Sequence, residues 1–519
     1  MKKTLPKIII CVLAAAALAL PLSLLSPVRA DAADHSAADA TRFTFSGSAI
    51  TAQDGDCTDY RIDGTALTIE GGGTYIISGS CPDGSITVKK GVTGVTLVLD
   101  GLTLTSENIA PIACNKSSEV TIVAAAGTVS TLTDGEANNS EYYAENEDAE
   151  SAVVKCKDGS NVTICGSGTL NITAVSKNGI KSGASSEEDG SASLTIRDVT
   201  LNISSSANDA INAGQELSIE SGTLTIAAED DAIHCDRVLN VGSDGTAGPS
   251  ITVTDCYEGL EAAELNIFSG DINIISSDDC LNAANPELTG YDFSMTISGG
   301  SISAYSSNGD GFDSNGDITV SGGRVVVWTA NTADNQPLDA DGTLTVSGGT
   351  VLAAGGSAGM GVRIDAAQPY VIFGSAGGMG GGQPGRRGGS SVLLLKNAAF
   401  SIKDSAGNTL LDETALCGAD YVFFSSPELT SGESYTLCSG SDSIADGDAQ
   451  TGSASFGGPG GGKQPDGQQP GGGRLPVSSG GTTVSQSPTP LTAPARQSSH
   501  LTPLRAGKAA PSEISTAKK

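Results

Sequence analysis

Basic residues and large aromatic residues are both scarce in this sequence. Lys and Arg together number 28 against 59 Asp and Glu, so the formal net charge is −31. Neutralising the phosphates of a nucleic acid requires clustered cations, and this charge balance argues against that class of partner. No CxxC pair occurs among the cysteines, so structural zinc and thiol redox motifs have little support.

Long apolar runs are absent except at the N-terminus. A lysine-containing start precedes an apolar stretch at 8–25, and residues 28–30 (Val-Arg-Ala) place small side chains at positions −3 and −1 of a cleavage site. A retained anchor is the alternative, but Pro21 interrupts the stretch. We therefore predict a signal peptide at 1–30 and a secreted, extracellular product without stable membrane insertion, either free or associated with the cell surface.

The abundant residues favour β-structure. The chain has 68 Gly, and Thr, Ser, Ile and Val are frequent. Gly disfavours helix, whereas β-branched residues favour strands. Ten cysteines follow the predicted signal peptide: Cys57, Cys81, Cys114, Cys156, Cys165, Cys235, Cys256, Cys280, Cys417 and Cys438. An exported chain permits disulfides, and buried cysteines that act as small apolar residues are an equal alternative.

A sequence unit recurs from about residue 168. Each unit has a Gly-initiated strand, a polar turn rich in Asn and Asp, and then an apolar residue. That apolar residue falls at Ile180, Ile211, Ile233, Leu260, Leu281, Phe312 and Leu338. A basal period of about 21 to 22 residues with occasional insertions is typical of one coil of a parallel β-helix. An antiparallel sandwich is the competing architecture, but it predicts no recurring register.

These patterns predict an all-β fold, a single-stranded right-handed parallel β-helix. The domain boundaries that we expect are a β-helix at 42–365, a Gly-rich linker at 366–391 and a small β-rich module at 392–440. A disordered tail rich in Gly, Pro and Ser follows at 441–519. Right-handedness is expected from the general chirality of parallel β connections. An acidic insertion within 133–150 is expected to form a mobile loop.

Acidic residues recur at one point of the repeat, in the turn around the apolar residue. The candidate metal ligands are Asp209, Asp230, Asp231, Asp236, Glu258, Glu261, Asp278, Asp279, Asp310 and Asp313. In stacked coils such residues lie about 4.8 Å apart, so uncompensated carboxylates would repel one another. Calcium prefers oxygen ligands and would neutralise them. The alternative is that the acids form local turn hydrogen bonds.

The combined repeats resemble a known bacterial family. GTLTIAAEDDAIHCD, YEGLEA, SSDDCLNAA and NGDGFDSNGDITVSGG look like the secreted carbohydrate-binding β-helix family of anaerobic Gram-positive bacteria, over about residues 60–365. The resemblance implies bound Ca²⁺ on the turns already named. It also implies binding to cellulose and to acidic plant polysaccharide such as polygalacturonate. Lys177 and Lys181 stand where acids are expected in the first repeat, so we expect no metal site there.

Calcium would reconcile an acidic protein with an acidic ligand by bridging carboxylates of both. A neutral glucan instead needs exposed aromatic rings, and the candidates near the repeats are Tyr257, Tyr305 and Trp328. Their scarcity favours an acidic polysaccharide of the plant cell wall, or another extracellular polysaccharide, over cellulose. The cations near the C-terminus are candidates for contact with an anionic cell-wall polymer; a plain solubilising tail is the alternative.

Two other classes of function remain open. Asp278-Asp279-Cys280 resembles the paired-Asp segment of polygalacturonases, but Gly-His-Gly is missing and Arg363-Ile364-Asp365 lacks the Lys of the Arg-Ile-Lys segment. A pectate lyase would need a basic residue in a motif that the sequence does not show. Paired acids that recur in several repeats indicate a structural or metal-binding role, so we predict a non-catalytic protein. A passive surface stalk or adhesin is the third class.

Overall fold

The computed structural model describes residues 39–184, 192–286, 288, 290–330, 335–356, 362–374 and 392–456. All regular elements in these ranges are β-strands. Among the described residues, no helix has the length and hydropathy that a membrane crossing requires. The predicted signal peptide and most of the predicted tail lie outside these ranges. The chain is therefore all-β, as the composition predicted.

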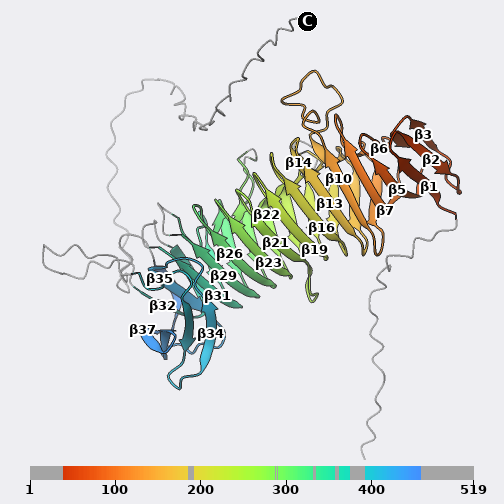
Figure 1. The fold of residues 1–519 in the computed structure, drawn as a ribbon. Helices are drawn as coiled ribbons and strands as arrows, with labels where there is room; N and C mark the ends of the chain where they lie inside the picture. The colour runs from red at the N-terminus through yellow and green to blue at the C-terminus, as the bar shows by residue number, and fades with distance from the viewer. Residues whose placement is uncertain are drawn as a thin grey trace, which may run out of the picture. The chain divides into compact units, whose positions relative to one another are not determined.

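Most strands join one large mixed sheet through three series of parallel neighbours (Figure 1). The first series runs β1 (Thr41–Ser46), β5 (Gly73–Cys81), β7 (Val95–Ser106), β10 (Val129–Asp134), β13 (Thr169–Ala174), β16 (Thr200–Ser205), β19 (Thr223–Ala228), β21 (Ser250–Asp255), β23 (Asp271–Ser276), β26 (Ser301–Ser306), β29 (Arg324–Thr329) and β31 (Thr350–Gly355). Each member pairs in parallel with the next, for example Leu201 with Leu224.

The second series carries the polar turns. It runs β4 (Ala66–Ile69), β6 (Ser85–Val88), β8 (Ile112–Cys114), β11 (Ala152–Cys156), β14 (Asn178–Ser182), β17 (Ile211–Ala213), β20 (Ile233–Val241), β22 (Leu260–Ile267), β24 (Leu281–Ala283) and β27 (Phe312–Ser314). An isolated parallel bridge from Phe312 to Leu338 extends it.

The third series completes each repeat. It contains β9 (Glu119–Ala124), β12 (Asn161–Cys165), β15 (Ser193–Ile196), β18 (Glu216–Ile219), the C-terminal parts of β20 and β22, β25 (Ser294–Ile297), β28 (Asp317–Val320), β30 (Leu344–Val346) and β32 (Val362–Phe373). A chain that visits the three series in turn returns to the first one repeat further along.

The stacked apolar residues form a continuous core. The seven residues that the sequence singled out, from Ile180 to Leu338, pair in register from one strand to the next and are fully buried. Burial of one such side chain contributes about 1.5–3 kcal/mol. The predicted register of the repeats is thereby confirmed, and it holds the polar residues beside each apolar residue in matching columns.

The two ends of the described chain are closed by antiparallel pairs. At the start, β1 pairs with β2 (Ala49–Gln53), and β3 (Tyr60–Asp63) pairs with β4. At the other end β35 (Tyr421–Ser425) pairs with β31 and β32, and β38 (Gln450–Phe456) pairs with β32. A separate sheet has the order β34 (Thr409–Thr414), β33 (Ala399–Lys403), β36 (Ser434–Ser439) and β37 (Asp442–Asp448).

Two predicted boundaries are wrong. Residues 366–373, assigned to the linker, continue strand β32, whose alternate residues are buried. Residues 442–456, assigned to the disordered tail, form β37 and β38. Both strands find partners that are distant in sequence, which local composition does not reveal. The rest of the linker, 375–391, lies outside the described residues.

The acidic insertion is anchored at its base. Asn138 Nδ2 donates to Asp134 Oδ2 at 3.0 Å and to the Ala152 carbonyl at 2.9 Å. Asn139 Nδ2 donates to the Ser176 carbonyl at 2.7 Å. The two amides are buried. These bonds attach the base of the insertion to two neighbouring repeats.

The ten cysteines are all unpaired, and only Cys57 is not buried. Cys114 and Cys156 stand side by side in register on β8 and β11. Within the described residues the nine buried cysteines therefore serve as small apolar residues of the interior.

Candidate functional site

Two columns of polar residues follow the second series. The first column holds the residue two positions before each stacked apolar residue: Asn178, Asp209, Asp231, Glu258, Asp279, Asp310 and Gln336. The second column holds the residue directly after it: Lys181, Asn212, His234, Glu261, Asn282, Asp313 and Asp339. Eight of these fourteen residues are acids, and the only cationic or titratable basic members are Lys181 and His234.

Backbone hydrogen bonds hold the first column at the spacing of neighbouring strands. The carbonyls of Asp231, Glu258 and Asp279 each accept an amide hydrogen from the preceding repeat, at 2.9–3.0 Å. Some carboxylates also bond the backbone of the following repeat. Asp310 N donates to Asp279 Oδ1 at 2.6 Å, and Gln336 N donates to Asp310 Oδ1 at 2.5 Å. The column therefore has little freedom to relieve its own charge by spreading apart.

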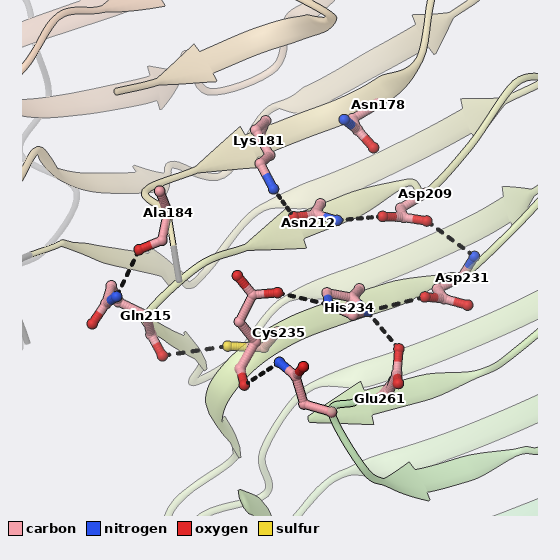
Figure 2. Close-up of polar contacts among 12 residues, drawn as sticks. Asn178, Lys181, Ala184, Asp209, Asn212, Gln215, Asp231, His234, Cys235 and Glu261 are labelled. Atoms are coloured by element: carbon pink, nitrogen blue, oxygen red, sulfur yellow. Dashed lines mark hydrogen bonds and ion pairs between the residues drawn. The ribbon is translucent and has the colours of Figure 1, made fainter. Parts of the chain in front are cut away.

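A cluster around His234 lies in the middle of the columns (Figure 2). His234 Nδ1 is 2.5 Å from Glu261 Oε2 and 3.1 Å from Asp231 Oδ2, and Nε2 is 2.9 Å from Asp236 Oδ1. The four side chains are each less than one-fifth exposed. We call these four residues the histidine cluster.

A second group joins Asp209, Asp230 and Asp231, whose carboxylate oxygens lie within 4.8 Å of one another. Asn212 Nδ2 donates to Asp209 Oδ2 at 2.5 Å, and Lys181 Nζ in turn bonds Asn212 Oδ1 (Figure 2). The lysine thus stands at the N-terminal end of the columns, and Asn212 links it to Asp209 by hydrogen bonds.

A third group joins Asp310, Asp313 and Asp339, again with oxygens within 4.8 Å of one another. We call it the aspartate cluster. Gln336 is attached to it on two sides, because its backbone donates to Asp310 and its Nε2 donates to Asp339 Oδ2 at 3.3 Å. Gln336 Oε1 is buried with no hydrogen-bond partner.

A second unpartnered amide oxygen stands beside the aspartate cluster. Asn282 is in register with Asp313, and its Oδ1 is also buried without a partner. A buried acceptor without a donor costs about 1–3 kcal/mol. Two such oxygens beside three carboxylates form the all-oxygen donor set that calcium takes. The residues present therefore fit a calcium ion.

Burial and mutual repulsion raise the pKa values of the column acids. Desolvation is the largest cause in each case. It raises the pKa of Asp310 to about 8, of Glu258 to about 9 and of Asp279 to about 7, with neighbouring carboxylates adding to the shift. The pKa values of Asp231 and Asp313 rise to about 7 and about 6 for the same reasons. The columns thus hold more carboxylates than their own basic side chains, Lys181 and His234, neutralise.

The pKa of His234 is also displaced. Burial alone lowers the pKa of the imidazole, but the hydrogen bonds to Asp231, Asp236 and Glu261 together raise it well above its usual range. The carboxylates therefore strongly favour a cation at this position.

All ten predicted acids lie on or beside the columns, but they do not form one site. Asp209, Asp230, Asp231, Asp236 and Glu261 gather around the first two groups, and Asp310 and Asp313 belong to the aspartate cluster. Glu258, Asp278 and Asp279 lie between them. Glu258 Oε2 accepts a bond from Asn282 Nδ2 at 2.9 Å.

Sequence reasoning missed four residues: His234, Asn282, Gln336 and Asp339. Each occupies a column position within two residues of a stacked apolar residue that the sequence had already singled out. The repeat register therefore marked these positions. The amides and the imidazole were not predicted because only carboxylates were considered as metal ligands. Asp339 was missed because its repeat diverges from the others.

The aromatic candidates are distributed differently from the prediction. Trp328 is fully buried, and its ring packs edge-to-face on Phe400 with centroids 5.8 Å apart, so its assignment as a sugar-stacking residue is wrong. Tyr305 is only partly accessible and packs against the same core, with Lys396 Nζ 6.0 Å above its ring. Tyr257 is 48% exposed. A hydrogen bond to Asp278, the residue before column member Asp279, raises the pKa of its hydroxyl to about 12.

The sequence matches the family model described as carbohydrate-binding domain-containing protein, over residues 63–361. The chain belongs to this family. The carbohydrate-binding domain therefore includes both columns and all three groups of side chains. A polysaccharide is the class of partner that membership implies.

One solved structure is similar to the chain: the polysaccharide lyase-like protein from C. thermocellum, as its gadolinium derivative. The sequence identity is 21%, the TM-score is 0.36, and the match covers 59% of this chain and 96% of that chain. No curated protein matches the sequence significantly.

Proposed function

We propose that this protein is secreted and non-catalytic, and that it binds acidic polysaccharide such as polygalacturonate through calcium held by its two columns. The aspartate cluster carries the proposal. Three carboxylates gather there, two residues with buried, unpartnered amide oxygens stand beside them, and calcium would satisfy all five groups. The proposed ligands are Asp310, Asp313, Asp339 and the amide oxygens of Gln336 and Asn282.

The same ion would also attach the ligand. Calcium takes six to eight oxygen ligands, which is more than the cluster supplies. The remaining positions are free for carboxylates of a uronic-acid chain, which a protein with a net charge of −31 would otherwise repel. Tyr257 is the exposed aromatic ring beside the columns and would add a stacking contact.

The recurrence of the acids supports a non-catalytic role. Asp279, the paired acid of the pectinase comparison, accepts a backbone hydrogen from the next repeat, and Asp310 does the same one repeat further on. A general acid occurs once in an active site, whereas this bond belongs to the repeat. A binding role without pectinase catalysis is thus the better account of these residues.

The fold that we propose is a right-handed parallel β-helix. The support is the return of the chain to the same parallel series once per repeat. Secretion rests on the predicted signal peptide at 1–30, and contact of the C-terminal tail with the cell wall remains part of the same proposal. N-terminal sequencing of the exported protein would test the cleavage after Ala30.

Sedimentation with insoluble polygalacturonate and with cellulose tests the function, with and without excess EGTA. We expect retention on polygalacturonate that EGTA abolishes, and no release of reducing ends or unsaturated uronides. Release of product would favour a pectinase instead. Absence of retention on both polymers would leave a surface stalk or adhesin.

Two matched variants assign the retention to the aspartate cluster. Asp313→Asn removes one proposed calcium ligand and should weaken both calcium binding and retention. Asp271→Asn alters an exposed acid on the first series and should change neither. Equal behaviour of the two variants would show that overall charge, and not this cluster, governs binding.

A further inference from the structure

The histidine cluster differs from the other acidic groups because it includes a nitrogen donor. Its geometry also has a feature that the oxygen-only groups lack. Two carboxylate oxygens, Glu261 Oε2 and Asp231 Oδ2, converge on the single nitrogen His234 Nδ1, at 2.5 and 3.1 Å. A ring nitrogen carries at most one hydrogen. An imidazolium therefore cannot donate fully to both carboxylates through that atom.

A divalent ion would satisfy all three atoms together. One donor atom from each of Asp231, His234 and Glu261 lies within 4.8 Å of the other two, and the three residues stand on neighbouring strands β20 and β22 and the turn before β20. We propose that Asp231, His234 and Glu261 bind a transition-metal ion of the zinc type, at a site separate from the calcium site of the aspartate cluster.

The other face of the imidazole supports this assignment. Nε2 lies 2.9 Å from Asp236 Oδ1. A metal-binding histidine usually donates its second ring N–H to a carboxylate, which fixes the tautomer and orients the ring. Asp236 holds that place and acts as a positioning residue. Its presence makes Nδ1 the unprotonated, metal-facing nitrogen.

The donor set determines which ion is preferred. Imidazole suits zinc and its neighbours in the first transition row, whereas calcium takes oxygen ligands only. Ligands about 2.0–2.1 Å from a tetrahedral ion lie about 3.3 Å from one another. The Asp231 oxygen already stands near that separation from Nδ1, and the Glu261 oxygen needs to retreat by under about 1 Å.

Charge also favours the divalent ion. Three carboxylates surround the one imidazole, and Asp209 and Asp230 stand next to Asp231. Lys181 lies nearby, but its ammonium group bonds the amide of Asn212. An ion with two positive charges on Asp231 and Glu261 leaves Asp236 to pair with the ring N–H.

The test uses the full mature protein, stripped with chelator and then saturated with Ca²⁺ to fill the oxygen-only sites. Co²⁺ is the probe, because its visible absorption reports ligand type and geometry, and Zn²⁺ is then added as competitor. We expect about one equivalent of Co²⁺ to bind with an imidazole–carboxylate spectrum, and Zn²⁺ to displace it.

Three variants assign the signal. His234→Gln should abolish it, and Asp236→Asn should weaken Co²⁺ binding by about 10–100-fold and alter the spectrum, as removal of an orienting carboxylate does. Asp313→Asn should weaken Ca²⁺ binding and leave Co²⁺ binding unchanged. Circular dichroism checks folding. If His234→Gln fails to fold, Asp236→Asn still tests the proposal, because its side-chain carbonyl retains a hydrogen-bond acceptor for the imidazole.

Two outcomes would overturn the proposal. If calcium-loaded wild type binds no Co²⁺, His234 acts as a built-in cation and no metal is held there. If His234→Gln binds Co²⁺ as tightly as wild type, the ion is held elsewhere. Neither outcome depends on polysaccharide retention, so the metal site and the proposed function are tested independently of each other.

Discussion

The indole of Trp328 and the phenol of Tyr257 are aromatic side chains with opposite surroundings. Trp328 is fully buried against Phe400, so Trp328→Ala should lower the free energy of unfolding by about 3–5 kcal/mol. Tyr257→Ala removes a half-exposed ring and should cost far less stability while reducing retention on polysaccharide. Chemical denaturation and sedimentation of both variants measure the two effects. If folded Trp328→Ala lost retention while Tyr257→Ala kept it, the assignment of stability to Trp328 and of retention to Tyr257 would be contradicted.

The raised carboxyl pKa values predict how metal-free protein responds to pH. Burial and neighbouring carboxylates raise the pKa of Asp310 to about 8 and that of Asp231 to about 7, against about 4 in the unfolded chain. At pH values between the unfolded pKa and the folded pKa of each acid, the folded state binds more protons than the unfolded state. The stability of the folded state therefore falls as pH rises through this window. The melting temperature in EGTA should therefore be lower at about pH 8 than at about pH 5.

Calcium should remove most of that dependence, because it stabilises the deprotonated columns and adds about 2.7 kcal/mol at a concentration 100 times its dissociation constant. Asp310→Asn is the matched variant, since it removes one titrating group, and its melting temperature in EGTA should vary less with pH. A melting temperature that rises steadily from about pH 5 to about pH 8 in EGTA would refute the assigned shifts.

The acidic residues of the site were predictable from the sequence because they recur at the same position of the repeat. All ten candidates lie on or beside the columns because the register of Ile211, Ile233 and Leu260 fixes their neighbours. The partition into separate groups was not predictable. It depends on which side chains turn toward one another across strands, as Glu261 turns to His234, and sequence spacing carries no such information.

At the scale of a strand, Gly259 separates Glu258 from Glu261 and lies directly against the next repeat. A Cβ at this position would be 2.1 Å from the Cys280 carbonyl oxygen, so β22 and β24 would have to move apart. Gly259→Ala should cost about 1–3 kcal/mol of stability. It should also weaken cation binding, because the columns would separate between Glu261 and Asn282.

Gly418→Ala is the control for this effect. Its Cβ would meet neighbouring atoms at 3.7 Å, an ordinary contact, so both stability and cation binding should stay close to wild type. Urea denaturation and calcium titration of the two variants provide the comparison. Equal stability of both would mean that the repeats tolerate a wider spacing than the structure indicates.

The elements themselves were predicted best where the repeat is regular. Parallel neighbours such as β16 and β19 follow from GTLNITA-type strands at a constant interval. The antiparallel hairpin β1–β2 and the pairing of β35 with β31 and β32 were not foreseen. Those pairings join segments without shared sequence, so no internal repeat indicated them.

At the scale of the whole molecule, the segment 392–456 covers the last strands of the large sheet. Leu352, Val371 and Phe373 are fully buried in a core cluster shared with that segment. Truncation before residue 392 should expose these residues together with the edges of β31 and β32, and the product should aggregate. Truncation after Phe456 keeps the covering strands and should remain soluble and bind polysaccharide.

Size-exclusion chromatography of the two truncations makes the comparison. A soluble, monomeric product from the shorter chain would show that the repeats are stable without their cover. Loss of polysaccharide retention by the longer one would instead assign a binding role to residues after 456.

The pairing of β35 with β31 and β32 has a consequence for the order of events during synthesis. The early repeats have all their neighbours as soon as the following repeat has emerged, so they are able to propagate from the N-terminus. Strands β31 and β32 instead wait for Tyr421–Ser425, which is made long after Phe373. The nascent chain therefore has a late interval in which its last edge is open to other chains, and the time needed to translate residues 374–420 sets its length.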